Sequence, residues 1–133
     1  MADKKSHLGD IVLILTTDDR ASHKPVTNLV QYEDVKGEYY FIAPRNSPAE
    51  WIRNIHANPW VDAQAKGKKV YGLVEPVMES PRIADFLESQ LSKNSQLVQD
   101  LIRTHGLPRK PSHAQMLALA GRITLFVLHP TRL

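Results

Sequence analysis

The stretch that decides the fold is IAPRNSPAEWIRNIHANPW, residues 42–60. A run of strand-forming residues ends at Ala43, and residues 44–47 interrupt it with a proline and three polar side chains. Ser47 and Glu50 have the spacing of a capping box, and Pro48 falls where the first helical position would be, where a missing N–H costs nothing. The stretch therefore predicts a strand, a tight corner and a short helix.

The predicted helix presents Trp51 and Ile55 on one face, and Asn58-Pro59 ends it. Two strand-like segments follow, Trp60–Ala65 and Val70–Val74, with a Lys-Gly-Lys turn between them. Two such segments joined by a short turn that contains glycine are expected to pair as a hairpin.

Three strands are predicted before this stretch. Ile11–Thr16 is a continuous apolar run, Val26–Tyr32 alternates, and Tyr39–Ala43 is rich in strand formers. The polar segments 18–25 and 33–38 are expected to be turns.

The second half of the sequence changes to a helical period. One helix is predicted after a cap at Ser80-Pro81, and a second ends at His105-Gly106. Ser112 begins another capping-box spacing, which leads a short helix, and Ile123–Leu128 is a final strand. The class is therefore α+β, with about six strands in an antiparallel sheet or small barrel.

Length and composition describe an ordinary folded chain. The 133 residues suit a single domain, 1–133, and the net charge is +3. The apolar runs are too short for an integral membrane segment, the first residues do not form a signal peptide, and there is no cysteine. We expect a cytoplasmic protein. The basic residues are scattered, so no nucleic acid partner is expected.

The search for catalytic motifs identifies no catalytic residue. The six histidines show none of the paired spacings of a metal site, and there is no nucleophile elbow, P-loop or dinucleotide fingerprint. We therefore expect no metal.

Three features remain, each with two interpretations. Arg20 and Lys24 in one turn and Arg45 at the corner either converge to bind an anion or are simply solvated. Asn28 shares a strand face with apolar residues, so its amide must bond either a neighbouring loop or a ligand. Trp51 either stacks on a planar ring or packs in the core.

Two motifs in this order resemble those of a known family. The run from Leu15-Thr16-Thr17 through Arg20 and Pro25 to Asn28 resembles the second-strand region of the deazaflavin (coenzyme F-420)-dependent nitroreductase and quinone reductase family. Residues 51–59 resemble the W-x-x-N-x-x-A-N-P helix of the same family. The resemblance covers roughly residues 10 to 90, together with the final strand.

The resemblance implies a six-stranded antiparallel split β-barrel, with a helix after the third strand and a helical excursion before the last. It implies a reductase, often a homodimer with the cofactor near the interface. Hydride would pass from reduced coenzyme F-420, or alternatively FMN, to a quinone, nitro compound or similar small electrophile as electron acceptor. A protein that only binds or carries flavin, deazaflavin or haem is the alternative.

The resemblance also implies roles for individual residues. Arg20 would bind the phosphate or acidic tail of the cofactor, and Arg45 would replace the family's lysine. Asn28 and the Ala43–Pro44 backbone would face the ring. The rest of the expected cofactor-binding set is Lys24, Thr27, Asn46, Trp51 and Asn54, of which Trp51 and Asn54 would support the ring. No tyrosine follows Tyr71, so the tyrosines that assist reduction in some members have no counterpart.

Overall fold

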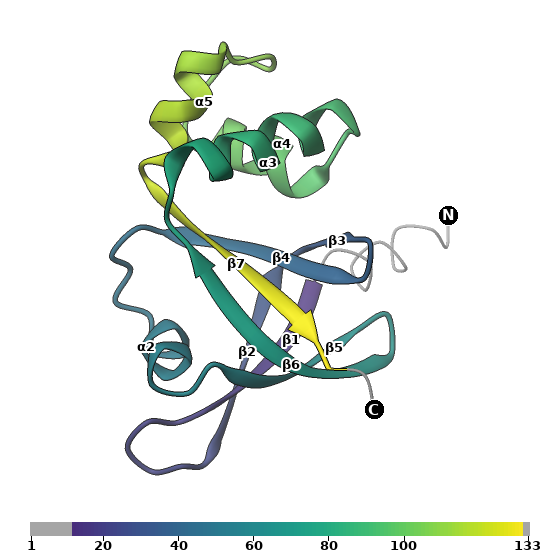
Figure 1. Ribbon diagram of the computed structural model, residues 1–133, viewed down its shortest axis with the longest axis vertical. Helices are drawn as coiled ribbons and strands as arrows, with labels where there is room; N and C mark the ends of the chain where they lie inside the picture. The colour runs from purple at the N-terminus through teal and green to yellow at the C-terminus, as the bar shows by residue number, and fades with distance from the viewer. Residues whose placement is uncertain (1–11, 132–133) are drawn as a thin grey trace.

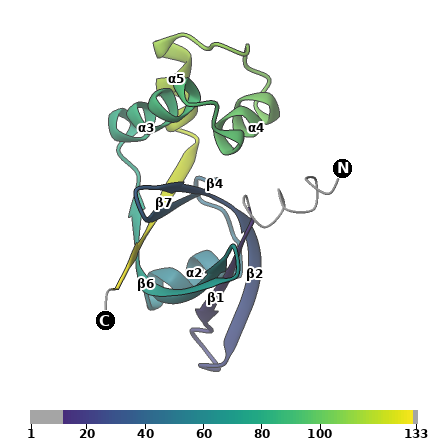
Figure 2. The same ribbon diagram turned by 90° about the vertical axis from the view of Figure 1, so that its right-hand side faces the viewer.

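The computed structural model describes residues 12–131. Within them the chain forms one antiparallel sheet of seven strands in the order β2-β1-β5-β6-β7-β4-β3, and four helices. The sheet curls into a half-barrel, and α3–α5 gather at one end of the molecule (Figures 1 and 2). The strands are β1 (Val12–Asp18), β2 (Pro25–Gln31), β3 (Glu33–Val35), β4 (Glu38–Pro44), β5 (Trp60–Ala65), β6 (Lys68–Val77) and β7 (Ile123–Pro130). The helices are α2 (Glu50–Ala57), α3 (Ser80–Ser92), α4 (Gln96–Thr104) and α5 (His113–Ala120).

The expected strand count of six is wrong, because the segment predicted as a turn contains β3. Glu33 pairs with Tyr40 across a hairpin whose two central residues, Lys36 and Gly37, both have positive φ. Such turns match the twist of the strands they join. A strand of Glu, Asp and Val has low intrinsic propensity, so only its pairing with β4 reveals it.

The capping box predicted at Ser47 and Glu50 is also wrong. Helix α2 begins at Glu50 after an N-cap at Ala49, and no side chain caps it. The Ser47 hydroxyl instead accepts a hydrogen bond from the Ala49 N–H at 3.3 Å. The Glu50 carboxylate is held by Arg20, and this tertiary contact replaces the local one.

The other two predicted helix starts differ in outcome. The Ser112 capping box is confirmed: the Gln115 N–H donates to the Ser112 hydroxyl, and the Ser112 N–H donates to the Gln115 side chain. Ser80 is not a cap, because α3 begins at Ser80 and its N-cap is Glu79. No helix within residues 12–131 is both long enough and apolar enough to cross a membrane.

Strand β7 separates two apolar cores. Its side chains alternate between them: Phe126 and Leu128 pack inside the barrel, and Leu125 and Val127 pack against α3–α5. This is why Ile123–Leu128 is buried throughout and reads as a continuous apolar run. The helical excursion therefore covers one side of the sheet through β7.

A charged network crosses the strands β6, β7 and β4. The His129 ring bonds the Glu38 carboxylate at 2.5 Å through Nδ1 and the Glu75 carboxylate at 2.9 Å through Nε2. Arg82 donates to Glu75 at 2.8 Å. Partial burial opposes the charged form of His129, but the hydrogen bonds and charges of the two carboxylates outweigh it and raise its pKa.

The raised His129 pKa predicts a pH-dependent contribution to stability. The contribution of charged His129 is full below the unfolded pKa of about 6.5 and is lost as the pH rises through the raised folded pKa. In urea unfolding, the difference in unfolding free energy between the wild type and His129→Gln should be larger at pH 6 than at alkaline pH. His113→Gln, which removes an exposed pairing with Glu88, is the control. A difference that grows with pH would contradict the assignment.

Candidate functional site

A cavity of about 380 Å³ lies where β2 and β4 approach each other under α4. Its lining is mostly apolar with a few polar groups, as small-molecule sites commonly are. The lining residues are Leu29, Val30, Gln31, Ile42, Ala43, Pro44, Leu97, Asp100, Leu101, Thr104, His105 and Ile123. Two residues of the expected cofactor-binding set, Ala43 and Pro44, are among them.

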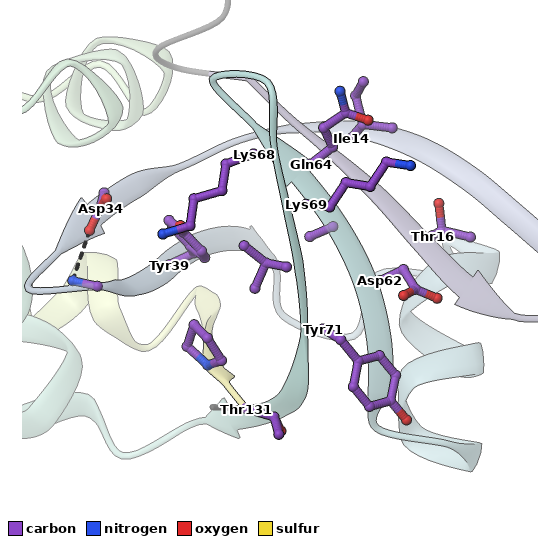
Figure 3. Close-up of a pocket in the computed structure, with 14 residues that line it drawn as sticks. Ile14, Thr16, Asp34, Tyr39, Asp62, Gln64, Lys68, Lys69, Tyr71 and Thr131 are labelled. Atoms are coloured by element: carbon purple, nitrogen blue, oxygen red, sulfur yellow. Dashed lines mark hydrogen bonds between the residues drawn. The ribbon is translucent and has the colours of Figure 1, made fainter. Parts of the chain in front are cut away.

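A larger cavity of about 700 Å³ surrounds the β5–β6 hairpin. Figure 3 shows Lys68 and Tyr39 on one side of the β5–β6 hairpin, and Lys69, Gln64 and Thr16 on the other. The larger cavity therefore wraps around the hairpin instead of forming one enclosed space. None of the expected cofactor-binding residues lines it.

Asn28 lies on the inner face of β2 with an unsatisfied oxygen. It pairs with Leu15, which is fully buried in the barrel core, and it is on the same strand face as Val30 of the smaller cavity. Its Oδ1 is buried and accepts no hydrogen bond from any residue between 12 and 131. A buried carbonyl without a partner costs about 1–3 kcal/mol. No neighbouring loop satisfies Asn28 within the described chain, which favours the ligand interpretation.

The corner after β4 is shaped by its backbone. The Ser47 N–H donates to the Pro44 carbonyl at 3.2 Å, and Asn46 takes a positive φ of 61°. Asparagine tolerates this left-handed conformation better than most residues. Asn46 is exposed.

Arg45 ties this corner to the helical excursion. Its guanidinium Nη2 donates to the carbonyls of Met78 at 3.0 Å and Ala120 at 2.9 Å. Ala120 is the last residue of α5, where the helix dipole favours a cation. The buried Nε of Arg45 has no hydrogen-bond partner among the described residues. The side chain thus bonds main-chain carbonyls at the base of α3–α5.

Arg20 is bonded to α2 instead. Its Nη1 donates to Glu50 at 2.6 Å and to Asn54 Oδ1 at 3.1 Å, and its backbone N–H donates to the same Oδ1. Asn54 is fully buried and donates in turn to Thr17 at 3.2 Å. The hydrogen bond between Arg20 and Glu50 raises the pKa of the arginine and lowers that of the carboxyl.

The two arginines therefore contact different parts of the molecule. The β1–β2 turn that carries Arg20 is at the end of the molecule away from α3–α5, to which Arg45 is bonded (Figure 1). Lys24 is exposed in the same turn as Arg20. Asp18 and Asp19 lie there too, and the Ser22 and Ala21 hydrogen bonds lower the Asp19 pKa. The turn is consequently mixed in charge rather than strongly basic.

Thr27 and Trp51 are not among the residues that line the cavity. The Thr27 hydroxyl hydrogen-bonds that of Thr16 at 3.2 Å and is exposed on the opposite face of β2 from Asn28. The Trp51 ring packs 5.4 Å from Phe126 and 5.8 Å from Phe41. Of its two interpretations, packing against the core is the one the structure shows.

The α4 wall of the cavity was not identified from sequence. Asp100, Thr104 and His105 face the cavity from one helix, opposite β2 and β4. The Gln31 amide of β2 donates to Asp100 at 2.8 Å across 69 residues of chain. No local sequence pattern predicts a contact between residues so far apart in the chain. Within residues 12–131, no group of three or more His, Asp or Glu is placed to bind a metal ion.

Comparisons with known proteins agree with this fold. A solved structure described as "F420 Reductase" has 22% identity and a TM-score of 0.55, over 96% of this chain and 93% of that one. "F420-H2 Dependent Reductase (FDR-A)" has 18% identity and a TM-score of 0.56, over 89% and 93%. The heme storage protein HutZ from Vibrio cholerae has 16% identity and a TM-score of 0.52, over 98% and 88%. At these identities the structures show a shared fold.

The sequence itself identifies the family. No curated protein matches it significantly. The sequence profile described as "F420H(2)-dependent quinone reductase" matches residues 4–104, which is most of the chain and includes both motifs and α2. The chain therefore belongs to the F420H(2)-dependent quinone reductase family.

Proposed function

We propose that this protein binds reduced coenzyme F-420 at the cavity between β2, β4 and α4 and reduces a small quinone-type acceptor there. When bound, the cofactor supplies the hydride, so the protein needs no nucleophile of its own. The observation that supports this site best is the buried, unsatisfied Oδ1 of Asn28, which is not itself among the lining residues but shares a strand face with Val30 of the cavity lining. A deazaflavin ring has an N–H on its polar edge that can donate a hydrogen bond to this oxygen.

The site suits an elongated ligand with a flat ring and an acidic tail. Ala43 and Pro44 offer a flat wall without charge, against which a ring can lie. Strand β2 has seven residues and spans about 20 Å from the cavity to the turn that carries Arg20 and Lys24. These cations would meet the acidic end, with the donors of Arg20 that Glu50 and Asn54 leave available.

Cofactor binding is tested by titrating the purified protein with oxidised coenzyme F-420 and, separately, with FMN. Saturable quenching of F-420 fluorescence is expected, with weaker binding of FMN. Reduced F-420 and menadione should then give turnover. The absence of saturable binding to either cofactor would contradict the proposal.

Replacing Asn28 by leucine should separate cofactor affinity from stability. Asn28→Leu is expected to weaken F-420 binding by about tenfold or more, because one buried hydrogen bond to the ring is lost. The free energy of unfolding should stay the same or rise, because the unsatisfied oxygen is removed. Fluorescence titration and urea unfolding measure the two quantities.

Gln64→Leu is the matched control, because it makes the same kind of change in the larger cavity at the β5–β6 hairpin. It should leave F-420 affinity unchanged. If Gln64→Leu weakens binding and Asn28→Leu does not, the cofactor occupies the larger cavity.

A carrier without turnover is the second candidate. It is favoured by the scarcity of reactive groups, since Asp100 and His105 are the titratable side chains among the described residues of the lining. It predicts tight binding of F-420, FMN or haem and no menadione reduction above the rate of the free cofactor. Turnover with reduced F-420 would exclude it.

We also propose a homodimer, supported by apolar side chains on the outer face of the sheet. Trp60 is opposite Leu73 in the β5–β6 pair and stacks on Tyr71 at 5.4 Å, and all three are at least a third exposed. Exposed apolar clusters of this kind mark interaction surfaces. Sedimentation equilibrium should give twice the chain mass, and a monomer at micromolar concentration would contradict this.

A further inference from the structure

We propose that His105 is the residue that donates a proton to the acceptor in the cavity between α4 and β4. This inference rests on the proposed function, because it assigns a role within the same site. It gives the helical excursion a place in the reaction: α4 forms the wall of the cavity opposite Ala43 and Pro44.

The position of His105 is set by the end of α4. His105 is the C-cap residue, and the next residue, Gly106, takes a positive φ of 68°. The Gly106 N–H donates to the Arg103 carbonyl and the Leu107 N–H to the Ile102 carbonyl, the two bonds of a Schellman ending. The backbone of His105 is therefore held at the edge of the cavity.

The orientation of the His105 ring is set by a second contact. Its Nδ1 is 3.0 Å from the Leu101 carbonyl oxygen. A carbonyl only accepts, so Nδ1 carries the hydrogen. Nε2 makes no hydrogen bond to any residue of the described chain and remains available to a bound molecule. A protonated ring can thus donate from Nε2 without giving up the bond at Nδ1.

The other groups of the cavity are unsuited to this role. Partial burial alone would raise the pKa of Asp100. Hydrogen bonds from Gln31 and Gln96 and the contact with Arg103 outweigh this effect and lower the pKa, so the carboxylate stays ionised. Arg103 on the same helix is exposed and held by Asp100. Within the described lining, β2, β4 and β7 contribute no charged side chain. No tyrosine is among the described lining residues, so His105 is the side chain of the cavity that can donate a proton.

The reaction balances with one proton from His105. Reduction of a quinone to a quinol needs two electrons and two protons, and a hydride brings two electrons and one of the protons. The second proton passes from His105 Nε2 to a quinone oxygen: the N–H bond breaks as the O–H bond forms. The neutral imidazole then takes a proton from solvent. A bound cofactor would supply the hydride and release one further proton to solvent, so that quinone and reduced F-420 together would give quinol and F-420.

The experiment compares His105→Gln with His113→Gln, which changes an exposed histidine outside the cavity lining. Glutamine can still donate to the Leu101 carbonyl but cannot carry a transferable proton. Oxidised F-420 should bind both variants within about twofold of the wild type. In single-turnover reduction of menadione at pH 6, His105→Gln should be slower by on the order of 100-fold, and His113→Gln unchanged.

The pH profile is the readout that a structural role would not move. The wild-type rate should depend on pH, because a titratable side chain supplies the proton, and the rate of His105→Gln should lose that dependence. Equal rates and profiles for His105→Gln and the wild type, with F-420 still bound, would overturn the role of His105 alone. Failure of the wild type to bind F-420 would instead overturn the proposed function.

A measurement on the wild-type protein without cofactor keeps the test independent of the variants. In imidazole ¹H–¹⁵N NMR spectra, menadione should shift the Nε2 signal of His105 and leave that of His113 in place. A titration that moves neither signal would overturn the proposal.

Discussion

Gly72→Ala is expected to lower the free energy of unfolding by about 3 kcal/mol or more. Gly72 is on the inner face of β6, between Val61 of β5 and Pro130 of β7. A Cβ added here would be 2.2 Å from the His129 carbonyl oxygen and 2.9 Å from the Pro130 Cα. Because both are backbone atoms, no side-chain rotation relieves the overlap, and β6 and β7 must separate. Urea unfolding followed by tryptophan fluorescence measures the loss.

Gly121→Ala is the matched control. Gly121 has a φ of −71°, which alanine adopts readily, and the nearest atom to an added Cβ is the Ala118 carbonyl oxygen at 3.5 Å. Its free energy of unfolding should be unchanged or raised by a few tenths of a kcal/mol up to about 1 kcal/mol. If Gly72→Ala cost no more than Gly121→Ala, the close approach of β7 to β6 would be refuted.

Asn54→Ala is expected to lower the free energy of unfolding by about 3 kcal/mol. The fully buried Asn54 amide joins helix α2 to strand β1 and to the turn that follows it. Removal leaves the buried Thr17 hydroxyl without this partner, which costs about 1–3 kcal/mol, and the part-buried Arg20 N–H loses its acceptor as well. Chemical denaturation at pH 7 measures the effect.

Gln99→Ala removes an exposed amide from α4 and should change stability by less than about 0.5 kcal/mol. Asn54→Asp keeps an acceptor for Arg20 and should lose less stability than Asn54→Ala. A loss under 1 kcal/mol for Asn54→Ala would show that α2 is held mainly by its apolar face, through Ile52 and Ile55.

The predictions from sequence that succeeded rest on local patterns. The capping box at Ser112 spans four residues and forms as predicted, and the apolar run at 123–128 is buried on both faces. The prediction at Ser47 failed although its spacing is the same, because Arg20, 30 residues away, pairs with Glu50. Strand β3 was missed for a related reason, since its pairing with β4 outweighs the weak propensity of its own residues.

The sequence by itself determined the class of fold and the order of its elements except β3, and two motifs indicated the family and its cofactor. The class of fold and the order of elements follow from hydrophobic periodicity and turn signals within short segments, whereas the family and its cofactor follow from the resemblance of the two motifs. The tertiary structure alone decided which side chains share a site. It bonds Arg20 to α2 and Arg45 to α5, leaves the Asn28 oxygen unsatisfied, and brings His105 and Ala43 into the lining of one cavity. Such contacts depend on how the sheet curls and where the helices dock against it. No spacing along the chain encodes that geometry.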